Sequence, residues 1–296
     1  MSRNTATASN RRYPGWEQET DMITIVTDSS AYFKKSEANE MGIRVIPMNY
    51  CVNGQIFSES FSDQNGDFEN LIKGSGNYST SHPNMAAFLS CFEEELRKDN
   101  EVLCITISSR LSGAYSTAYV AAKQTESPNV AVFDSQLTSG GLYLLIKEAV
   151  KLIENGLSLT ELLRDLLPIR DRITIAFSVD DMTPLRNSGR IGFVRMSVGT
   201  FLNIKPILLC KDGAIVSDSI ARGNEDIIKR LSAKISVNTQ AAVISYLGDS
   251  RLASTLYHVI RKDFPNVEIS LQKIGPVLGI HLGLKAIAVS FIDAHC

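Results

Sequence analysis

The sequence predicts an α/β protein in two parts: a mostly parallel N-terminal sheet flanked by helices, and a C-terminal α+β part with a mixed sheet. Up to residue 171, short β-branched strands alternate with helical segments, which is typical of a parallel sheet covered on both faces. Beyond it, glycine- and serine-rich turns and a hairpin signal at Asp212-Gly213 indicate a more mixed sheet. We therefore predict domains at residues 22–171 and 172–296. Residues 1–21 are rich in Ser, Thr, Asn and Arg without an apolar run, so we expect a disordered leader there and not a secretory signal.

The first elements are two strands and a turn. The β-branched run from Met22 to Asp28 predicts a buried strand that leads into a polar loop. Residues 43–49 predict a second strand, and Asn53-Gly54 marks a turn of the kind found in hairpins. Residues 58–78 are rich in glycine and serine, and we do not expect them to contribute to the core.

A helix, a strand and a second helix follow. Apolar residues recur at helical spacing over residues 85–96, and Ser81 and Pro83 suit the first turn of that helix. Residues 101–107 predict a strand, and Ser112-Gly113 opens a helix that continues to Ala122. Residues 129–133 predict the next strand of the sheet.

Two more helices complete the first part. Residues 142–154 keep an apolar stripe in helical register, and Ser158 forms a capping box with Glu161 at the start of another helix, which Pro168 is expected to stop. In the second part we expect strands at 173–179, 204–210 and 241–245, and an apolar strand that ends at His281.

The composition narrows the classes of function. The formal net charge is -2 and no basic block stands out, so we expect no nucleic-acid partner. The 5 cysteines are scattered without a Cys-x-x-Cys pair, which favours a reducing, cytoplasmic setting. The 4 histidines form no metal-binding motif, so neither a metal nor another cofactor is expected. The longest apolar runs are too short to cross a bilayer.

Polar residues gather in four segments that could form a binding site. They are Ser79 to Pro83, Ser108 to Gly113, Asn187 to Gly192 with Arg190 between glycines, and Gly275 to Gly283 around His281. Hydroxyls and backbone N–H groups at a helix N-terminus can hold an anion, and Gly113 allows close approach of the backbone. Each segment also has a plainer explanation. Ser81 and Ser112 can simply cap helices, and His281 can be a structural residue. Arg190 can be either a carboxylate partner or simply an exposed loop charge.

Together, these segments resemble the DegV family in their order and spacing over nearly the whole chain. The matching segments are Thr27-Asp28-Ser29, Thr80-Ser81-His82-Pro83, Ile107 to Tyr115, Phe133-Asp134-Ser135, Ser188 to Gly192, Leu202 to Ile207, and Gly275 to His281. The resemblance implies a two-domain α/β architecture with one long-chain fatty acid buried between or within the domains.

The resemblance also implies a function and a set of site residues. The protein is expected to be the fatty-acid-binding, non-catalytic subunit of a fatty acid kinase, which presents the carboxylate to a separate kinase subunit for acyl-phosphate formation in phospholipid synthesis. A transient contact with the membrane surface belongs to this expectation. The family's carboxylate contacts fall on Thr80 and Ser112, and its His and Arg near the headgroup fall on His281 and Arg190. Ser81 and Gly113 support them.

Two departures from the family pattern and two alternative functions remain at this point. The Gln that usually follows Thr-Ser in the family is His82 here, and Gly283-Leu284-Lys285 replaces a Gly-Pro-Gly-like run after His281. One alternative is a regulatory or interaction protein that senses lipid and binds other macromolecules. The other is a lipid esterase or thioesterase with Ser112 or Ser109 as nucleophile and His281 as base. The sequence lacks the Gly-x-Ser-x-Gly elbow that α/β-hydrolases use, which weighs against this alternative.

Overall fold

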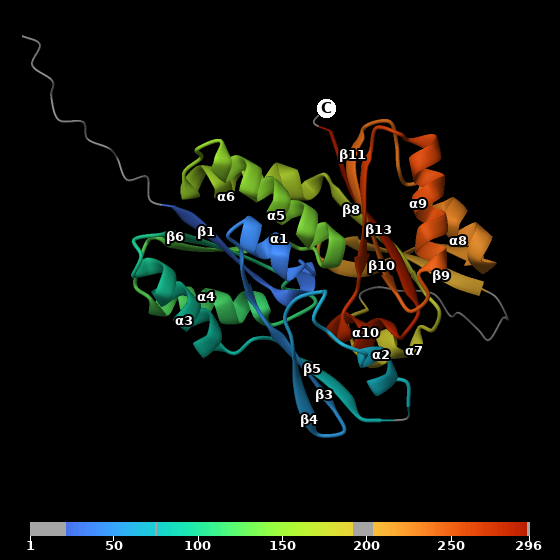
Figure 1. Ribbon diagram of the computed structural model, residues 1–296, viewed down its shortest axis with the longest axis horizontal. Coiled ribbons are helices and arrows are strands. Elements are labelled where there is room, and N and C mark those ends of the chain that lie inside the picture. Colours follow the sequence, from blue (N-terminus) through green and yellow to red (C-terminus); the bar gives the residue numbers. More distant parts are fainter. Residues whose placement is uncertain (1–21, 75, 192–203, 295–296) are drawn as a thin grey trace, which may run out of the picture.

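The computed structural model describes residues 22–74, 76–191 and 204–294, and contains three sheets of four, six and three strands. Figure 1 shows the four-stranded sheet with its helices in one half of the molecule and the six-stranded sheet in the other. The predicted leader at 1–21, and Gly192, Leu202 and Asn203 of the family segments, lie outside the described residues.

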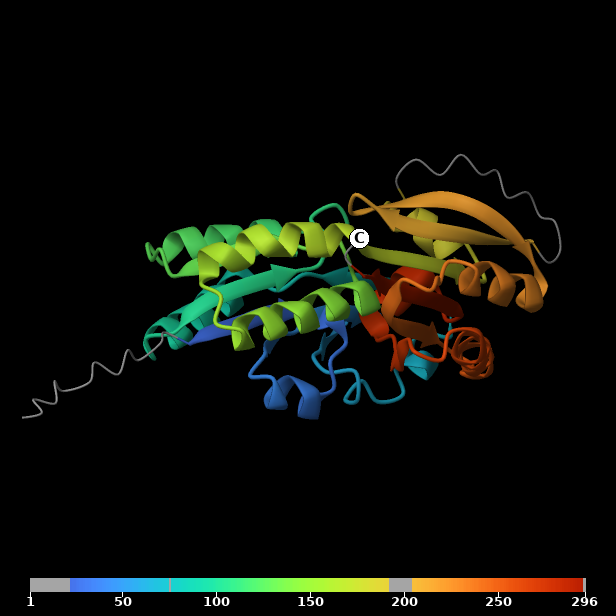
Figure 2. The ribbon, with the colours of Figure 1, turned by 90° about the horizontal axis from the view of Figure 1, so that it is seen from above.

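The four-stranded sheet is parallel throughout, as predicted, with the order β2-β1-β6-β7. Helices α5 and α6 cover one face, and α3 and α4 cover the other (Figures 1 and 2). The bounds are β1 Ile23–Asp28, α1 Lys35–Glu40, β2 Arg44–Ile46, α3 Met85–Leu96, β6 Glu101–Thr106, α4 Ala114–Gln124, β7 Val130–Asp134, α5 Ser139–Glu154 and α6 Leu159–Asp171.

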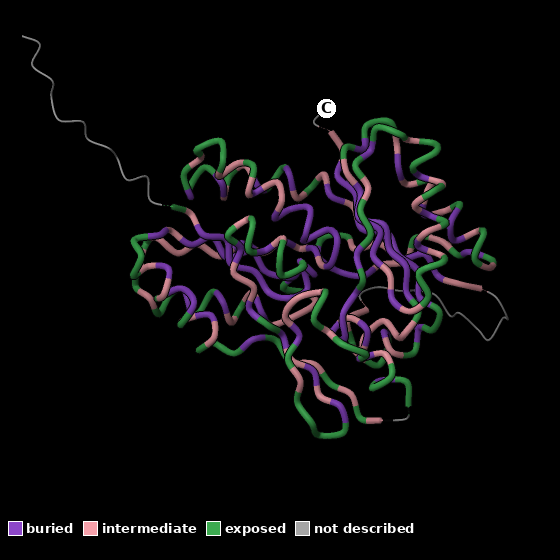
Figure 3. The backbone as a smooth tube through the Cα atoms, viewed as in Figure 1, coloured by how far each residue is buried: buried purple, intermediate pink, exposed green. Residues whose placement is uncertain are grey.

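Alternation along the strands explains why both faces of this sheet are covered. Ile25 of β1 packs into the cluster that includes α5 and α6, and the next residue, Val26, packs into the cluster that includes α3 and α4. Both side chains are buried, because successive residues of a strand point to opposite faces. The strands therefore form the buried centre of this half (Figure 3).

The six-stranded sheet is mixed, as predicted, with the order β10-β9-β8-β13-β11-β12, in which only β11 and β12 pair in parallel. Helices α8 and α9 pack on one face, and α5 packs on the other, so that α5 lies between the two larger sheets. The bounds are β8 Ile173–Val179, α7 Thr183–Asn187, β9 Ile204–Lys211, β10 Ala214–Arg222, α8 Gly223–Ser232, β11 Thr239–Leu247, α9 Arg251–Asp263, β12 Glu268–Lys273, α10 Pro276–Leu282 and β13 Ala286–Asp293. The domain boundary at residues 171/172 stays a prediction.

The three-stranded sheet was not predicted. It consists of β3 (Met48–Val52) between β4 (Gln55–Glu59) and β5 (Tyr78–Ser81), all antiparallel. The strand expected at 43–49 is divided, because its first part pairs with β1 and its second part, after Pro47, enters this sheet. Asn53 (φ 51) and Gly54 (φ 86) connect β3 to β4, and a positive φ at both turn residues is typical of a type I′ hairpin.

Four predictions about elements were wrong. Asn84, and not Ser81, caps α3, because its side chain accepts from the N–H of Ala87 at 2.9 Å, and Ser81 belongs to β5. His281 lies in a helix, α10, which begins with Pro276 in its first turn. Pro168 lies inside α6, which continues to Asp171. The polar stretch 58–78 contains α2 (Phe68–Leu71), and its Phe68 is buried in the core.

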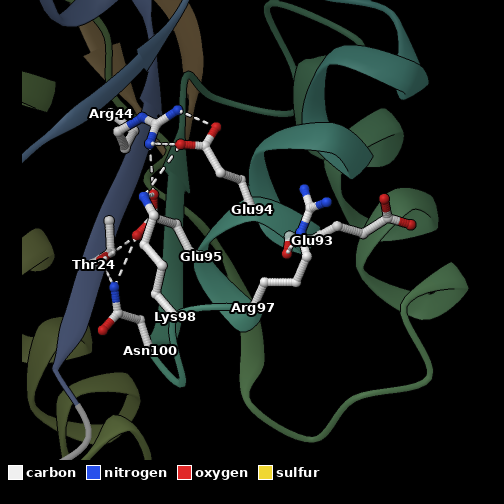
Figure 4. Close-up of polar contacts among 8 residues, drawn as sticks. All are labelled: Thr24, Arg44, Glu93, Glu94, Glu95, Arg97, Lys98 and Asn100. Carbon is white, nitrogen blue, oxygen red and sulfur yellow. Dashed lines mark hydrogen bonds and ion pairs between the residues drawn. The ribbon is translucent and has the colours of Figure 1, made fainter.

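A polar network fixes α3 to the amino-terminal ends of β1 and β2 (Figure 4). The buried carboxylate of Glu95 accepts from Arg44, from Thr24 Oγ1 at 3.1 Å and from Asn100 Nδ2 at 2.9 Å. Lys98 pairs with the same carboxylate at 2.9 Å. A buried charge is tolerated here because cations and hydrogen-bond donors surround it.

A second buried network links the two larger sheets. Gln272 of β12 donates through Nε2 to the carbonyl of Ala31, which follows β1, at 2.9 Å. Its Oε1 accepts from Ser245 Oγ of β11 at 3.0 Å, and Ser139 Oγ at the start of α5 donates to Ser245 Oγ at 3.1 Å. No helix among the described residues is long and apolar enough to cross a membrane.

Candidate functional site

An apolar cavity of about 260 Å³ lies where the three sheets approach one another. Its wall combines the loop after β6, the inward face of β8, the end of β5 and helix α10. The apolar lining residues include Ile107, Leu111, Ile175, Phe177, Ile215, Val277, Leu278 and Ala288.

All six residues that the sequence singled out line this cavity. They are Thr80, Ser81, Ser112, Gly113, Arg190 and His281. The elements that bring them there differ in part from expectation. Thr80 is presented by a strand and His281 by a short helix, whereas Ser112 and Gly113 precede α4 as predicted. Their role in binding a carboxylate stays a prediction.

Thr80 and His281 form a polar pair in the apolar wall. Thr80 Oγ1 lies 2.7 Å from His281 Nε2, although the two residues are far apart in the sequence. Burial, and secondarily the charge of Arg190, lower the pKa of His281 to about 4. The imidazole is therefore neutral at neutral pH.

Ser112 and Gly113 lie at the opening of α4. Ser112 Oγ accepts from the N–H of Ala114 at 3.3 Å and keeps its own proton for another acceptor. A Cβ on Gly113 would lie 2.7 Å from the ring of His82, so only glycine lets this ring lie against the backbone. His82 Nδ1 lies 3.0 Å from the carbonyl oxygen of Pro83, a contact that fixes the ring in this position.

Arg190 donates hydrogen bonds to two backbone carbonyl groups at the site. Its Nε donates to the carbonyl of Leu111 at 3.4 Å, and Nη1 donates to the carbonyl of Ser188. It is therefore not a freely exposed loop charge. Its guanidinium also influences His281 electrostatically, which places a permanent positive charge beside the Thr80–His281 pair.

The same polar residues face a second, open hollow. Thr80, Arg190 and His281 also line a depression of about 590 Å³ on the other side of the pair, together with Asn77, Thr183 and Asn187. The polar end of the cavity and this more exposed hollow thus share their wall.

Sequence reasoning missed a buried acidic group next to the cavity. Asp28, Tyr32 and Glu59 are buried, and Glu59 contacts the first turn of α10. Glu59 falls in the stretch that had been assigned to the surface. The only available signal was the alternation of side chains along the strand. Phe57 and Glu59 are two residues apart, so they lie on the same face of a strand that follows an Asn-Gly turn.

The geometry does not favour the hydrolase alternative. A Ser112 nucleophile would need His281 as its base, but Nε2 of His281 contacts Thr80 Oγ1 instead. Among the described residues no group of three or more His, Cys, Asp or Glu side chains is arranged to hold a metal ion.

Comparison with known proteins identifies relatives over nearly the whole chain. The model of a family described as uncharacterised proteins of the DegV family matches residues 22–294. A DegV domain-containing protein of Halalkalibacterium halodurans is 30% identical over 276 residues, which cover 91% of this chain and 98% of that protein.

Solved structures give the same result. The structure described as fatty acid binding of a DegV family protein from Thermus thermophilus matches with a TM-score of 0.82 and 29% identity, and covers 92% of this chain and 99% of that one. DegV from Bacillus subtilis, described as a fatty acid binding protein, matches with a TM-score of 0.80 and 25% identity over 92% of this chain and 99% of that one.

Proposed function

The chain belongs to the DegV family, and from this premise we propose that it binds one long-chain fatty acid, with the tail in the cavity and the carboxylate beside Thr80 and Ser112. The observation that carries the proposal is the wall of the cavity, which is mostly apolar and includes Thr80, Ser112, Arg190 and His281 among its polar residues. Relatives described as fatty acid binding share the fold.

The apolar tail supplies most of the affinity in this proposal. Burial of each CH₂ is worth about 0.8 kcal/mol, so a chain of about sixteen carbons gains on the order of 12 kcal/mol before the costs of ordering. A wall that includes Ile175, Phe177 and Val277 suits such a tail.

The carboxylate needs hydrogen-bond donors, because a bare charge is costly to bury. The neutral His281 orients one of them. If Nε2–H donates to Thr80 Oγ1, the hydroxyl proton of Thr80 is free to donate to the carboxylate. Ser112 supplies a second hydroxyl, and Arg190 supplies a positive charge that donates to backbone carbonyls and to no carboxylate among the described residues. In this arrangement His281 acts through Thr80.

We further propose that the bound carboxylate is presented to a separate kinase subunit in the cytoplasm, where ATP is abundant. Supporting this, Thr80, Arg190 and His281 line both the cavity and the open hollow, so a carboxylate at this point can be approached from outside. A carboxylate oxygen would attack the γ-phosphorus of ATP, giving an acyl phosphate for phospholipid synthesis and ADP. The chain contains no phosphate-binding Gly-x-x-x-x-Gly-Lys loop of its own, which favours a partner.

Extraction and mass spectrometry of lipid from the purified protein test the first proposal. We expect about one long-chain fatty acid per chain. Thr80→Val removes a hydroxyl at constant shape and is expected to weaken binding by roughly 10- to 150-fold, since a hydrogen bond to a charged group is worth about 1.5–3 kcal/mol. Thr160→Val, at an exposed position of α6, is the matched control. Equal lipid occupancy in both variants contradicts the proposed site.

A second assay separates the carrier from a hydrolase. Purified protein loaded with fatty acid, a bacterial fatty acid kinase subunit and ATP should form an acyl phosphate that hydroxylamine traps as a hydroxamate. Release of free acid from an acyl thioester by the purified protein alone would instead favour the hydrolase.

A further inference from the structure

Glu59 is a fully buried carboxyl group that the proposed function does not use. It ends β4, and its exposed fraction is 0%. Oε2 accepts from the backbone N–H of Val277 at 2.8 Å, and Oε1 accepts from Ser29 Oγ at 3.1 Å. Tyr32, whose hydroxyl oxygen accepts from the N–H of Leu278 at 3.3 Å, also hydrogen-bonds Glu59. These contacts hold the first turn of α10.

The other end of the same helix carries His281, which contacts Thr80. Glu59 and Thr80 belong to one sheet: Glu59 pairs with Met48 and Thr80 with Tyr50 of the central strand. Met48 and Tyr50 are two residues apart, so Glu59 and Thr80 project from the same face. Helix α10 packs against β3 and β5, and the sheet therefore holds this seven-residue helix at both ends.

Gly275 shows how closely the carboxyl group approaches α10. A Cβ at this position would lie 2.4 Å from Glu59 Oε2 and 2.8 Å from a ring carbon of Tyr32. The backbone of Gly275 has φ -91, so the glycine is required by the close packing of Glu59 and Tyr32 and not by its own conformation.

Stability alone does not explain a carboxyl group at this position. Its partners are hydroxyls and a backbone N–H, and no cation among the described residues pairs with it. Burial, with the nearby Asp28 as a further cause, raises its pKa to about 8. The other titratable groups that face it are Tyr32 and Tyr50. An apolar side chain would fill this space at a smaller desolvation cost, whereas only a hydrogen-bond acceptor can hold the N–H of Val277.

We propose that Glu59 is a positioning residue for the carboxylate site: by holding the first turn of α10, it sets His281 against Thr80 and so directs the Thr80 hydroxyl into the cavity. This inference rests on the proposed function for the identity of the ligand. The position of His281 is measured in delipidated protein, so this part of the test does not depend on the identity of the ligand.

The test compares Glu59→Ala and Glu59→Gln with Glu95→Ala. Glu95 is also a buried carboxylate, but it lies in the network at the opposite end of the strands (Figure 4) and controls for general destabilisation. The readouts are the imidazole ¹⁵N resonances of His281 in delipidated protein, assigned with His281→Gln, and the dissociation rate of palmitate.

In Glu59→Ala we expect changed His281 resonances and dissociation about tenfold faster, because α10 loses its anchor. Glu59→Gln keeps an acceptor for Val277 and should stay within about twofold of the wild type. Glu95→Ala should leave the His281 resonances unchanged. If Glu59→Ala leaves them unchanged too, the inference is overturned.

If Glu59→Ala does not fold, Gly275→Ala takes its place, because the added Cβ displaces the Glu59 carboxyl group without removing it. The same change of His281 is expected, and unchanged resonances in this variant overturn the inference. A wild-type protein that binds no palmitate would refute the proposed ligand, while the dependence of His281 on Glu59 would still be decided by the resonances.

Discussion

Two ionisable residues at the cavity, the partly buried His281 and the fully buried Glu59, are expected to be neutral near pH 7, for different reasons. Burial and Arg190 lower the pKa of His281 to about 4, and burial and Asp28 raise the pKa of Glu59 to about 8. Both groups avoid charge in an apolar surrounding. The site therefore offers the carboxylate polar but uncharged neighbours, with the charge of Arg190 at its margin.

The raised pKa of Glu59 predicts how stability depends on pH. Between about pH 4.5, its ordinary pKa, and about pH 8, the folded protein keeps a proton that the unfolded chain has lost. Because the lowered pKa of His281 acts in the opposite direction between about pH 4 and 6.5, the net fall in the free energy of unfolding is expected above about pH 6.5. Glu59 itself lowers the free energy of unfolding as pH rises through its whole range. Asp28, whose pKa burial also raises, acts in the same direction above its ordinary 3.8. Urea denaturation of the wild type and Glu59→Gln at several pH values measures this, and we expect a weaker decline in Glu59→Gln. Parallel pH profiles would contradict the assignment.

The residues of the site were predictable from the sequence only where they fall in short motifs. Thr80, Ser112, Arg190 and His281 were identified by their place in the family pattern, and the fold brings them to one cavity. Glu59 carries no such motif. Its importance depends on the pairing of β4 with β3 and on its contact with helix α10, more than two hundred residues later in the chain. Local sequence patterns do not encode such long-range contacts.

At the scale of elements, the segment between β5 and α3 packs against the opening of α4 through His82 and Gly113. Gly113→Ala places a Cβ 2.7 Å from the ring of His82 and should displace either the ring or the start of α4. We expect a loss of roughly 1–3 kcal/mol in the free energy of unfolding, the usual cost of overpacking. His82→Ala should remove most of this loss in the double variant, which denaturant titration of all four proteins can measure. Additive losses would show that the two residues do not interact.

The errors at element boundaries have a common physical cause. Ser81 and Pro83 suit a helix start, yet pairing of Ser81 with Asn49 of β3 extends the strand, and the helix begins only after Asn84. The apolar run before His281 resembles a strand, but Pro276 and the buried acceptor Glu59 fix the first turn of a helix. Tertiary contacts override local preference in both cases.

At the scale of the whole molecule, the cavity lies between parts of all three sheets, so filling it should stabilise the chain as a unit. Fatty acid at about one hundred times its dissociation constant is expected to add about 2.7 kcal/mol to the free energy of unfolding. Thermal unfolding of delipidated and reloaded protein measures this, with Thr80→Val as the variant expected to gain less at the same ligand concentration. A melting temperature that does not respond to palmitate would argue against binding in the interior.

The alternation of strands and helices was sufficient to predict the parallel sheet, because hydrophobic periodicity within a segment determines which face is buried. For the six-stranded sheet, the mixed character and the strands β8, β9 and β11 were predicted, whereas β12 and β13 were not. The three-stranded sheet was not predicted. Its strands are short and partly polar, and β5 joins β3 across the intervening residues 53–77. The cavity depends on this sheet, since Met48, Thr80 and Ser81 contribute to its wall.

The buried amide of Gln272 restricts the relative motion of the two larger sheets. A clamshell motion that parted the two larger sheets would break the hydrogen bond between this amide and the Ala31 carbonyl and disrupt the buried network around it. Exchange of a guest molecule should therefore proceed through a local gate. The short helix α10 is the natural candidate for that gate, because it forms part of the wall, has seven residues and makes polar contacts with the three-stranded sheet near both of its ends.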